Sequence, residues 1–214
     1  MNRACEPELL DSLPHDHPDA AHNRRDLRII NAFMRNRAWF ARTLPRLLRP
    51  GERVLEVGAG TGEMGAALHA QGLPVDGLDL WPRPGRWPPG CAWHQADLRS
   101  FGGYGAYAAV IGNLIFHQFK PGELAALGAA LRHGPRVILA CEPLRRELSK
   151  RMMSVMGPLL GANFVTMHDA RVSIDAGFVG AELPAALGLL PPAWDAPCGA
   201  TVMGAYRMAA VRRP

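Results

Sequence analysis

The sequence predicts an α/β fold in which helices flank a mainly parallel sheet. Three observations lead to this prediction. Short apolar runs typical of buried strands alternate with segments of helical periodicity through the middle of the chain. A glycine-rich turn joins the first of these strands to a helix. The chain has 214 residues, of which 48% are hydrophobic and 20% charged, which suits one globular domain with a sizeable core.

The elements are predicted in chain order from periodicity, glycine and proline. Residues 1–50 form an acidic lead and a basic helical cap, in which Pro45 should interrupt the helix. Residues 51–214 form the main domain. Its strands are expected at 53–57, 75–80, 91–95, 107–112 and 136–141, with two last strands near 178–184 and 201–211. Its helices are expected at 62–70, 121–131, 144–160 and 167–176.

The cap has two interpretations. Between Asn23 and Pro50 the chain carries eight arginines and one acid, Asp26. This is typical of a solvated helix face, and a sharper interpretation is a lid over an active-site mouth. The lead before the cap interleaves histidines with acids, namely His15, Asp16, His17, Asp19 and His22. We predict no metal site there, because no regular element holds these side chains in a fixed geometry.

The glycine turn reads Glu56-Val57-Gly58-Ala59-Gly60-Thr61-Gly62. A dinucleotide site would have a glycine three positions after Gly60, where this chain has Glu63, whose carboxylate would face a pyrophosphate with the wrong charge. Glu56 precedes the turn, and an acid there suits a ligand with a cationic head. The glycines allow positive φ angles and a close approach of the backbone to a ligand.

This run resembles motif I, E-x-G-x-G-x-G, of the class I S-adenosylmethionine (SAM) methyltransferases. The resemblance implies a Rossmann-like methyltransferase fold with a seven-stranded, mainly parallel sheet and SAM as cofactor. It covers about residues 50–142 well and continues in element order to the C-terminus. One departure is Ala108, where the family often has an aspartate in the fourth strand.

The resemblance assigns further cofactor contacts at the ends of successive strands. The turn from Glu56 to Gly62 would hold the methionine part of SAM. Asp79 would bind both ribose hydroxyls, and Leu80 would lie against the adenine. Asp97, followed by Leu98, would accept a hydrogen bond from the adenine amine, and Asn113 would lie under the methionine. Ligands of open α/β sheets bind at these carboxyl ends.

The residues after Asn113 indicate the class of methyl acceptor. They read Leu-Ile-Phe-His-Gln-Phe, which lacks the N-P-P-Y of enzymes that methylate exocyclic amino groups. The form N-L-x-x-H-x-F instead resembles small-molecule methyltransferases of the ubiquinone and biotin biosynthesis type. This argues against nucleic acid as the acceptor, despite a net charge of +5 that comes almost wholly from arginine.

Two histidines are candidate catalytic residues. His117 titrates near neutrality in its ordinary state and would take a proton from the acceptor, although it is as well explained as a packing residue beside the next helix. His168, in the region that often supplies acceptor contacts, is the second candidate. It is not expected to pair with Asp169, because neighbours on a helix do not face each other. Glu142 ends the fifth strand and faces the same edge.

The sequence therefore predicts a SAM-dependent methyltransferase of a small molecule. The alternatives are a catalytically silent SAM- or nucleotide-binding protein of the same fold, and an RNA methyltransferase that uses the basic cap. No apolar run is long enough to span a bilayer, and the first residues lack a secretory apolar segment, so we expect a cytoplasmic protein. Its four cysteines are scattered and predict neither disulfides nor zinc.

Overall fold

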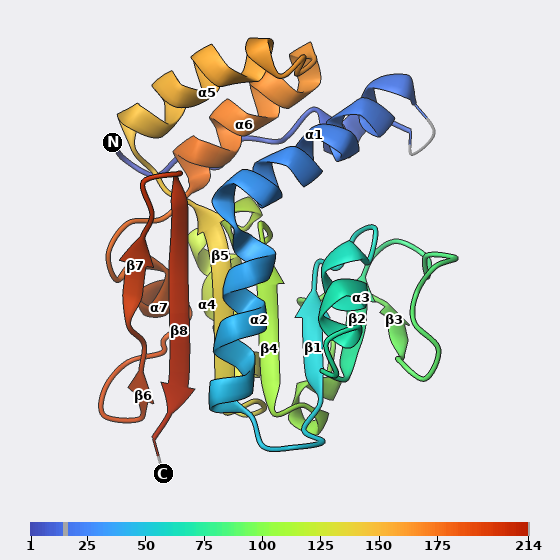
Figure 1. The fold of residues 1–214 in the computed structure, drawn as a ribbon. Coiled ribbons are helices and arrows are strands. Elements are labelled where there is room, and N and C mark those ends of the chain that lie inside the picture. The colour runs from blue at the N-terminus through green and yellow to red at the C-terminus, as the bar shows by residue number, and fades with distance from the viewer. Residues whose placement is uncertain (15–16, 214) are drawn as a thin grey trace.

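The structure, a computed structural model, describes residues 1–14 and 17–213, so His15 and Asp16 of the acidic lead lie outside the described residues. Its centre is an eight-stranded sheet with the order β3-β2-β1-β4-β5-β8-β6, in which β7 also pairs with β8 (Figure 1). The strands are β1 (Val54–Val57), β2 (Val75–Asp79), β3 (Trp93–Gln95), β4 (Ala109–Asn113), β5 (Val137–Pro143), β6 (Trp194–Asp195), β7 (Cys198–Ala200) and β8 (Ala205–Arg212).

The first five strands are parallel, and β8 runs antiparallel to β5. Their carboxyl ends therefore lie along one edge of the sheet, which we call the carboxyl edge. The strand order changes direction between β1 and β4, because β2 lies on one side of β1 and β4 on the other. Such a switch point is where open α/β sheets bind their ligands.

Helices cover both faces of the sheet and its carboxyl edge. The α-helices are α1 (Pro18–Met34), α2 (Asn36–Leu47), α3 (Glu63–His69), α4 (Pro121–Arg132), α5 (Glu147–Leu159), α6 (Phe164–Ala176) and α7 (Glu182–Ala186). Three short 3-10 helices are η1 (Leu10–Ser12), η2 (Gly103–Ala106) and η3 (Phe116–Gln118). Helices α1, α5 and α6 lie above the carboxyl edge in Figure 1.

Two apolar clusters, one on each face, form the core. One joins α4 and α7 to the sheet through buried leucines such as Leu124, Leu127 and Leu183. The other joins α2 and α3 to the opposite face, with Phe40 and Leu44 of α2 fully buried against Val54 and Val75. Because apolar burial is the main favourable contribution to folding, α2 is part of the core layer of this domain.

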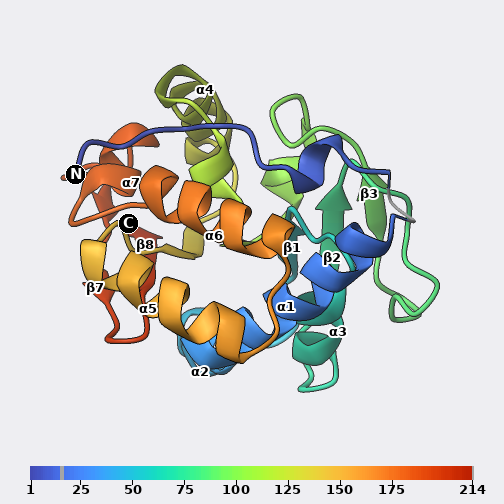
Figure 2. The same cartoon turned by 90° about the horizontal axis from the view of Figure 1, so that it is seen from above.

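The N-terminal strap, residues 1–10, crosses the molecule beside α6 when viewed from above (Figure 2). Arg3 anchors it by donating hydrogen bonds to the carbonyl oxygens of His117, Phe119 and Ala176 at 2.8 to 2.9 Å. The guanidinium also lies 4.7 Å from the centre of the Phe178 ring. These contacts hold the strap along η3 and the end of α6.

The cap differs from the expected single helical run, because it begins at Pro18 instead of near Asn23, so Asp19 and His22 lie on a helix and not in an irregular lead. Arg35 has φ of 55° and separates α1 from α2. Pro45 was predicted to interrupt the helix, but α2 continues through it. It lies in the last turn of this helix, where its missing N–H removes one hydrogen bond and the remaining backbone continues as helix.

Most predicted strands and helices are present within a few residues, but residues 178–184 are not a strand. Phe178 forms only an isolated bridge with Leu144, and the segment then turns into α7. Gly180 at φ of 52° makes this turn possible. A short apolar run fits a strand and a buried helix equally, so the predicted strand was wrong. The short strands β6 and β7 were not predicted and bring the sheet to eight strands rather than seven.

No helix in the described part of the chain is long and apolar enough to cross a membrane. All four cysteines are free, with Cys91 and Cys141 buried. Among residues 1–14 and 17–213, no group of three or more histidine, cysteine or acidic side chains is placed to hold a metal ion.

Candidate functional site

The glycine turn lies at the carboxyl end of β1. Gly58, Gly60 and Gly62 have φ of 65°, 52° and 74°, which glycine adopts without the steric penalty other residues incur. Gly58 and Ala59 donate their N–H groups to Leu78 O at 2.9 and 3.2 Å, so the turn is tied to β2. Ala59 is buried and Thr61 exposed. The expected positive φ angles are thus present at all three glycines.

Around the turn, added side chains would meet very different surroundings. A Cβ at Gly58 would lie 2.6 Å from Ile115, and one at Gly62 would lie 2.7 Å from Trp87. A Cβ at Gly60 would meet no atom within 4 Å. Gly58 and Gly62 are therefore packed against the protein, and Gly60 faces open space in which a ligand can lie against the backbone.

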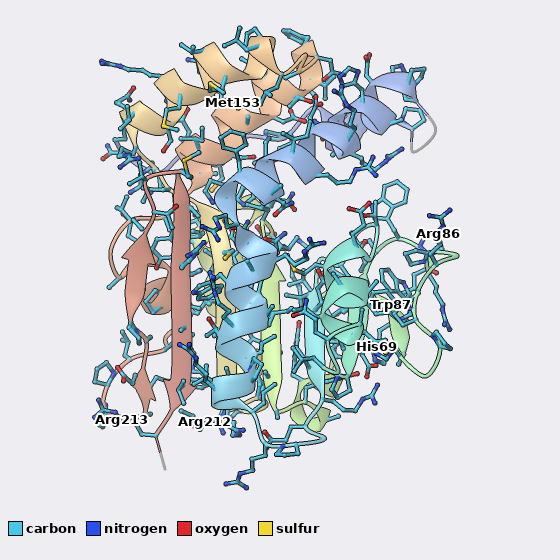
Figure 3. The ribbon with its side chains drawn as sticks, in the orientation of Figure 1. His69, Arg86, Trp87, Met153, Arg212 and Arg213 are labelled. Atoms are coloured by element: carbon cyan, nitrogen blue, oxygen red, sulfur yellow. The ribbon has the colours of Figure 1, made fainter. Side chains whose placement is uncertain are left out.

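Trp87 supports the turn from the β2 side, a role that sequence analysis missed. Its ring fills a slot made by Gly62, Gly65 and Gly77, where added Cβ atoms would come within 2.5 to 3.2 Å. Its indole N–H lies 3.2 Å from the carbonyl oxygens of Cys91 and Ala92. Figure 3 labels Trp87 beside α3 and β2. The sequence signal was the set of glycines on α3 and β2, which leave room for one large ring.

Glu56 lies behind the turn and is buried. The backbone N–H of Gly65 stabilises its carboxyl group, and Oε2 has no hydrogen-bond partner among the described residues. Burial raises the pKa of Glu56 to about 8, with a further contribution from the negative charge of Asp79. At neutral pH this carboxyl is largely protonated, and a direct contact with a cationic ligand stays a prediction.

Asp79 ends β2 and joins that strand to the turn. One carboxylate oxygen accepts from the N–H of Gly60 at 2.7 Å, and the other accepts from the N–H of Trp81 at 2.8 Å. Leu80, next in the chain, is exposed. A carboxylate has room for about four hydrogen bonds, so Asp79 retains acceptor capacity for hydroxyl groups placed over Gly60.

Asp97 follows β3 and is engaged by Arg99. Its oxygens accept from the N–H and guanidinium of Arg99 at 2.6 to 3.0 Å, and Arg99 also donates to Glu123 at 2.7 Å. Hydrogen bonds from Arg99 lower the pKa of Asp97, which is ionised at neutral pH. Leu98 is buried in the core. The adenine contact assigned to Asp97 stays a prediction, with most of its acceptor sites already used.

Asn113, at the end of β4, joins two asparagines of the cap that sequence analysis missed. Asn36 donates to Asn113 Oδ1 at 2.9 Å and to Asn31 Oδ1 at 3.0 Å, and Asn113 donates to Asn31 Oδ1 at 3.0 Å. Asn36 is fully buried, and its Oδ1 has no hydrogen-bond partner among the described residues. No periodicity signals such residues, since they lie at the α1–α2 break that only the structure shows.

His117 lies between two carboxylates. Its Nδ1 is 2.7 Å from Glu142 and its Nε2 is 3.3 Å from Glu8 of the strap. Burial alone would lower the pKa of His117, but hydrogen bonds to Glu142 and Glu8, together with their charges, raise it to about 9. The ring is therefore protonated at neutral pH, and the predicted role of proton acceptor does not fit this arrangement.

Glu142 also accepts hydrogen bonds from the backbone of η3. The N–H groups of Ile115 and Phe116 lie 3.1 and 2.9 Å from its Oε1, and that of His117 lies 3.2 Å from its Oε2. Glu142 is completely buried, so it does not line an open pocket. It positions the segment after β4 instead.

His168 and Asp169 lie on α6. Contrary to expectation, the two neighbours do contact each other, with Nδ1 of His168 3.1 Å from Oδ1 of Asp169. The main partners of Asp169 are the backbone N–H groups of Leu9 and Leu10, at 2.7 and 3.0 Å. Asp169 therefore fixes the strap on α6, and a contact of His168 with the acceptor stays a prediction.

Two cavities lie near α6, away from the glycine turn. One of about 420 Å³ lies between α5 and α6 and is lined by Lys150, Met153 and Met167 among others; Figure 3 labels Met153. The other, of about 190 Å³, lies under the strap against Glu8, His117 and Val172. The second cavity adjoins the segment after β4. Of these two cavities, it is the one lined by a predicted site residue, His117.

Comparison with known proteins gives a likeness of fold. No family model matches the sequence, and no curated protein matches it either. Among solved structures, the plantazolicin methyltransferase BpumL in complex with a triazolic desmethylPZN analog and SAH is 11% identical. That alignment covers 96% of this chain and 93% of the other, with a TM-score of 0.74.

Magnesium protoporphyrin IX methyltransferase (ChlM) from Synechocystis PCC 6803 with bound SAH is 18% identical, covers 86% of this chain and 83% of the other, and has a TM-score of 0.53. A possible exported protein from Bordetella parapertussis is 15% identical, covers 84% and 67% respectively, and has a TM-score of 0.57. The chain therefore has the Rossmann-like fold of these methyltransferases, which confirms the predicted fold class.

Proposed function

We propose that this chain is a SAM-dependent methyltransferase acting on a small-molecule acceptor. One observation carries the proposal: the positive-φ glycine turn meets Asp79 at the switch point of the sheet, with open space over Gly60. The fold likeness to structures that hold SAH supports the same cofactor here. The residues present fit such a ligand. Gly60 has no side chain, so the space beside its backbone, which a Cβ would occupy, is open to the ligand.

In the proposal, five parts of the site contact different portions of the cofactor. The backbone of the glycine turn lies against its amino-acid part, and Asp79 accepts hydrogen bonds from its ribose hydroxyls. Leu80 lies against the adenine, and Asp97 is the remaining acceptor for the adenine amine. The asparagine cluster of Asn31, Asn36 and Asn113 bounds the methionine end from the cap side.

SAM, when bound, supplies a methyl group already activated by a sulfonium. The chain's own contribution is then positioning and exclusion of water, since a well-oriented acceptor needs little further activation. In the view from above, α1 and α6 lie over the carboxyl edge, on the side where the acceptor would enter (Figure 2). Because His117 is held as an ion pair, the proposed reaction assigns it a positioning role through Glu142 and the segment after β4.

Calorimetry with SAH tests the cofactor. We expect saturable binding, and we expect Asp79→Ala to weaken it at least about tenfold, because each charge-assisted hydrogen bond contributes roughly 1.5–3 kcal/mol. Asp79→Asn keeps one acceptor oxygen, so its affinity for SAH should lie between that of the unchanged protein and that of Asp79→Ala. Asp195→Ala, which removes an exposed acid on β6, is the matched control. Absence of binding by folded protein at millimolar SAH would overturn the proposal.

Turnover separates the enzyme from a silent binding protein of the same fold. Radiolabelled SAM is incubated with the protein and with size-fractionated cell extract. Label transferred to a low-molecular-weight fraction supports the proposal. Binding of SAM without transfer to any fraction favours the silent protein, and label in RNA would instead assign the acceptor to that class.

A further inference from the structure

The basic charge of the chain is concentrated in one segment. The eight arginines and one acid between Asn23 and Pro50 carry a net charge of +7, whereas the whole chain carries +5, so the remaining residues together carry −2. A general preference for arginine in the composition would spread this excess along the sequence. The segment therefore has a basic character that composition alone does not explain.

Four arginines of this segment recur along α2 at intervals of seven, four and three positions. The fully buried Phe40 and Leu44 turn one side of α2 toward the sheet. Arg42 and Arg46 each follow one of them by two positions, about 200° around the helix, and so point away from the sheet. The four residues are all exposed, and we call them the arginine face: Arg35, Arg42, Arg46 and Arg49.

Neighbouring acids do not neutralise the arginine face. The two acids nearest to α2 in sequence and the one acid of the adjacent helix α3 each pair with an arginine outside the face: Asp26 with Arg25 at 3.7 Å, Glu52 with Arg136, and Glu63 with Arg28 at 3.3 Å. Glu52 also accepts a hydrogen bond from the backbone N–H of Arg49 at 2.7 Å, so it reduces the positive charge at that end only. Among the described residues, no ion pair involves Arg35, Arg42 or Arg46.

The length of the arginine face suits an extended polyanion. From Arg35 to Arg46 the helix rises about 16 Å. Double-stranded DNA carries one phosphate charge per about 1.7 Å of its axis, so it presents roughly nine phosphates over this length. Helix α2 lies in front of the sheet in Figure 1 and at the margin of the molecule in Figure 2. A duplex can therefore lie along it.

Two other anionic partners fit the arginine face less well. Helices that bind a lipid bilayer insert apolar side chains, but the apolar side of α2 is buried in the core. No large hydrophobic side chain of residues 35–51, all of which the structure describes, is exposed. An acidic protein would need apolar and aromatic contacts at the centre of its interface, which the face also lacks. Phosphate contacts instead gain affinity from the release of counterions and need no apolar surface.

We propose that the arginine face of α2 binds the phosphate backbone of a nucleic-acid duplex, independently of its base sequence. The face lies on one side of the sheet, whereas the glycine turn lies at the carboxyl edge. The duplex is therefore a partner other than the methyl acceptor. The inference uses no residue of the proposed cofactor site, so it is tested separately from the proposed function.

Fluorescence anisotropy of the full chain with a labelled duplex of about 20 base pairs tests this proposal without SAM. One probe is DNA and the other is RNA of the same sequence, which distinguishes the two sources of phosphate backbone. We expect saturable binding to at least one of them. With three to four phosphate contacts, raising the salt from about 50 to 200 mM should weaken binding roughly 40- to 150-fold, because more counterions are released with each neutralised phosphate.

The test variant carries Arg42→Gln, Arg46→Gln and Arg49→Gln, which remove three charges from exposed positions. At about 50 mM salt we expect its binding to be at least about tenfold weaker, with a shallower salt dependence, since each lost phosphate contact lowers the slope by about one. The matched control removes three exposed arginines outside α2, through Arg86→Gln, Arg151→Gln and Arg171→Gln. It has the same net charge and should bind within about twofold of the unchanged protein.

Circular dichroism and thermal unfolding verify that both variants are folded. The proposal would be overturned if the unchanged protein bound neither duplex at low salt, or if the two triple variants lost affinity equally. Binding of polyglutamate or of anionic vesicles without binding of a duplex would instead assign the arginine face to an acidic protein or to a membrane.

Discussion

Glu56 and Asp79 differ in environment although both lie beside the glycine turn. Asp79 is surrounded by backbone N–H donors and is positioned to accept further bonds. Glu56 is buried with one such donor, and burial raises its pKa to about 8. Glu56 and Asp79 thus have different roles. Asp79 is available to a ligand, and Glu56 fills the space behind the turn.

The buried Glu56 predicts a pH-dependent stability. Its pKa is about 8 in the folded state and 4.5 for the free side chain, so unfolding releases its proton between these values. The free energy of unfolding should therefore fall as pH rises from 4.5 to 8. Glu56→Gln removes this contribution, and we expect it to gain roughly 1–4 kcal/mol relative to the unchanged protein between pH 5 and pH 8.

Urea unfolding at pH 5, 6.5 and 8 measures this difference. Glu147→Gln, on the exposed face of α5, controls for the loss of one surface acid. Parallel pH profiles for Glu56→Gln and the unchanged protein would show that Glu56 is ionised in the folded state.

His117 connects two segments that are distant in the sequence. Its imidazolium, held between Glu142 and Glu8, ties the segment after β4 to the strap. Burial would raise the pKa of Glu8, but hydrogen bonds from His117 and Ser173 lower it below its ordinary value. The charged pair is thus favoured in the folded protein. It explains why a histidine that the sequence offers as a base is instead a fixed structural group.

The turn between β1 and α3 requires glycine for two separate reasons, a positive φ and the absence of a side chain. Gly58 and Gly62 need both a positive φ and the absence of a side chain, because Ile115 and Trp87 pack on them. Gly60 needs a positive φ but faces open space. The element is therefore rigid where it meets the protein and accessible at one backbone position.

Gly60→Ala separates folding from ligand binding. A left-handed conformation costs an alanine roughly 1–2 kcal/mol, so a modest loss of stability is expected. We also expect SAH affinity to fall more than about tenfold, since the new methyl group occupies the open space against the backbone. Thermal unfolding and calorimetry measure the two effects.

Gly51→Ala is the matched control for this change. Gly51 has φ of 81° and no atom within 4 Å of an added Cβ, but it lies before β1, at the opposite edge of the sheet. It should show the same stability loss with unchanged SAH affinity. Equal affinity of Gly60→Ala and Gly51→Ala would contradict our placement of the ligand.

At the scale of the whole molecule, the first fifty residues are joined to the rest by core packing. Phe40 and Leu44 of α2 are fully buried against the sheet, and the strap binds α6 and η3 through Arg3 and backbone groups. Asn36 links the cap to β4. The division into a cap of 1–50 and a domain of 51–214 stays a prediction, and this packing opposes independent folding of the second part.

Leu44→Ala tests this view. Removing a fully buried leucine leaves a cavity and typically costs about 2–5 kcal/mol, whereas Leu47→Ala, at a partly buried position, should cost less. Urea unfolding of both variants and of the fragment 51–214 gives the comparison. A fragment that unfolds cooperatively at the same urea concentration as the full chain would show that the cap is a separate unit.

Local sequence patterns are enough to predict the α/β architecture, the glycine turn and the order of the acids at the strand ends. These depend on local chemistry: glycines that must adopt positive φ, apolar runs that must be buried, and carboxyl ends that parallel strands bring to one edge. Local patterns could not determine residues 178–184, where an apolar run fits two structures, or the helix break at Arg35.

Which polar residues contact each other depends on the packing of the whole chain. The asparagine cluster joins positions 31, 36 and 113, and the buried ion pairs join positions 8, 117 and 142. This packing also determines that Leu159 and Phe164 lie exposed at the turn between α5 and α6 instead of in the core. Such contacts depend on how distant segments pack, because a side chain's partners and burial are set by the whole chain and not by its neighbours in sequence.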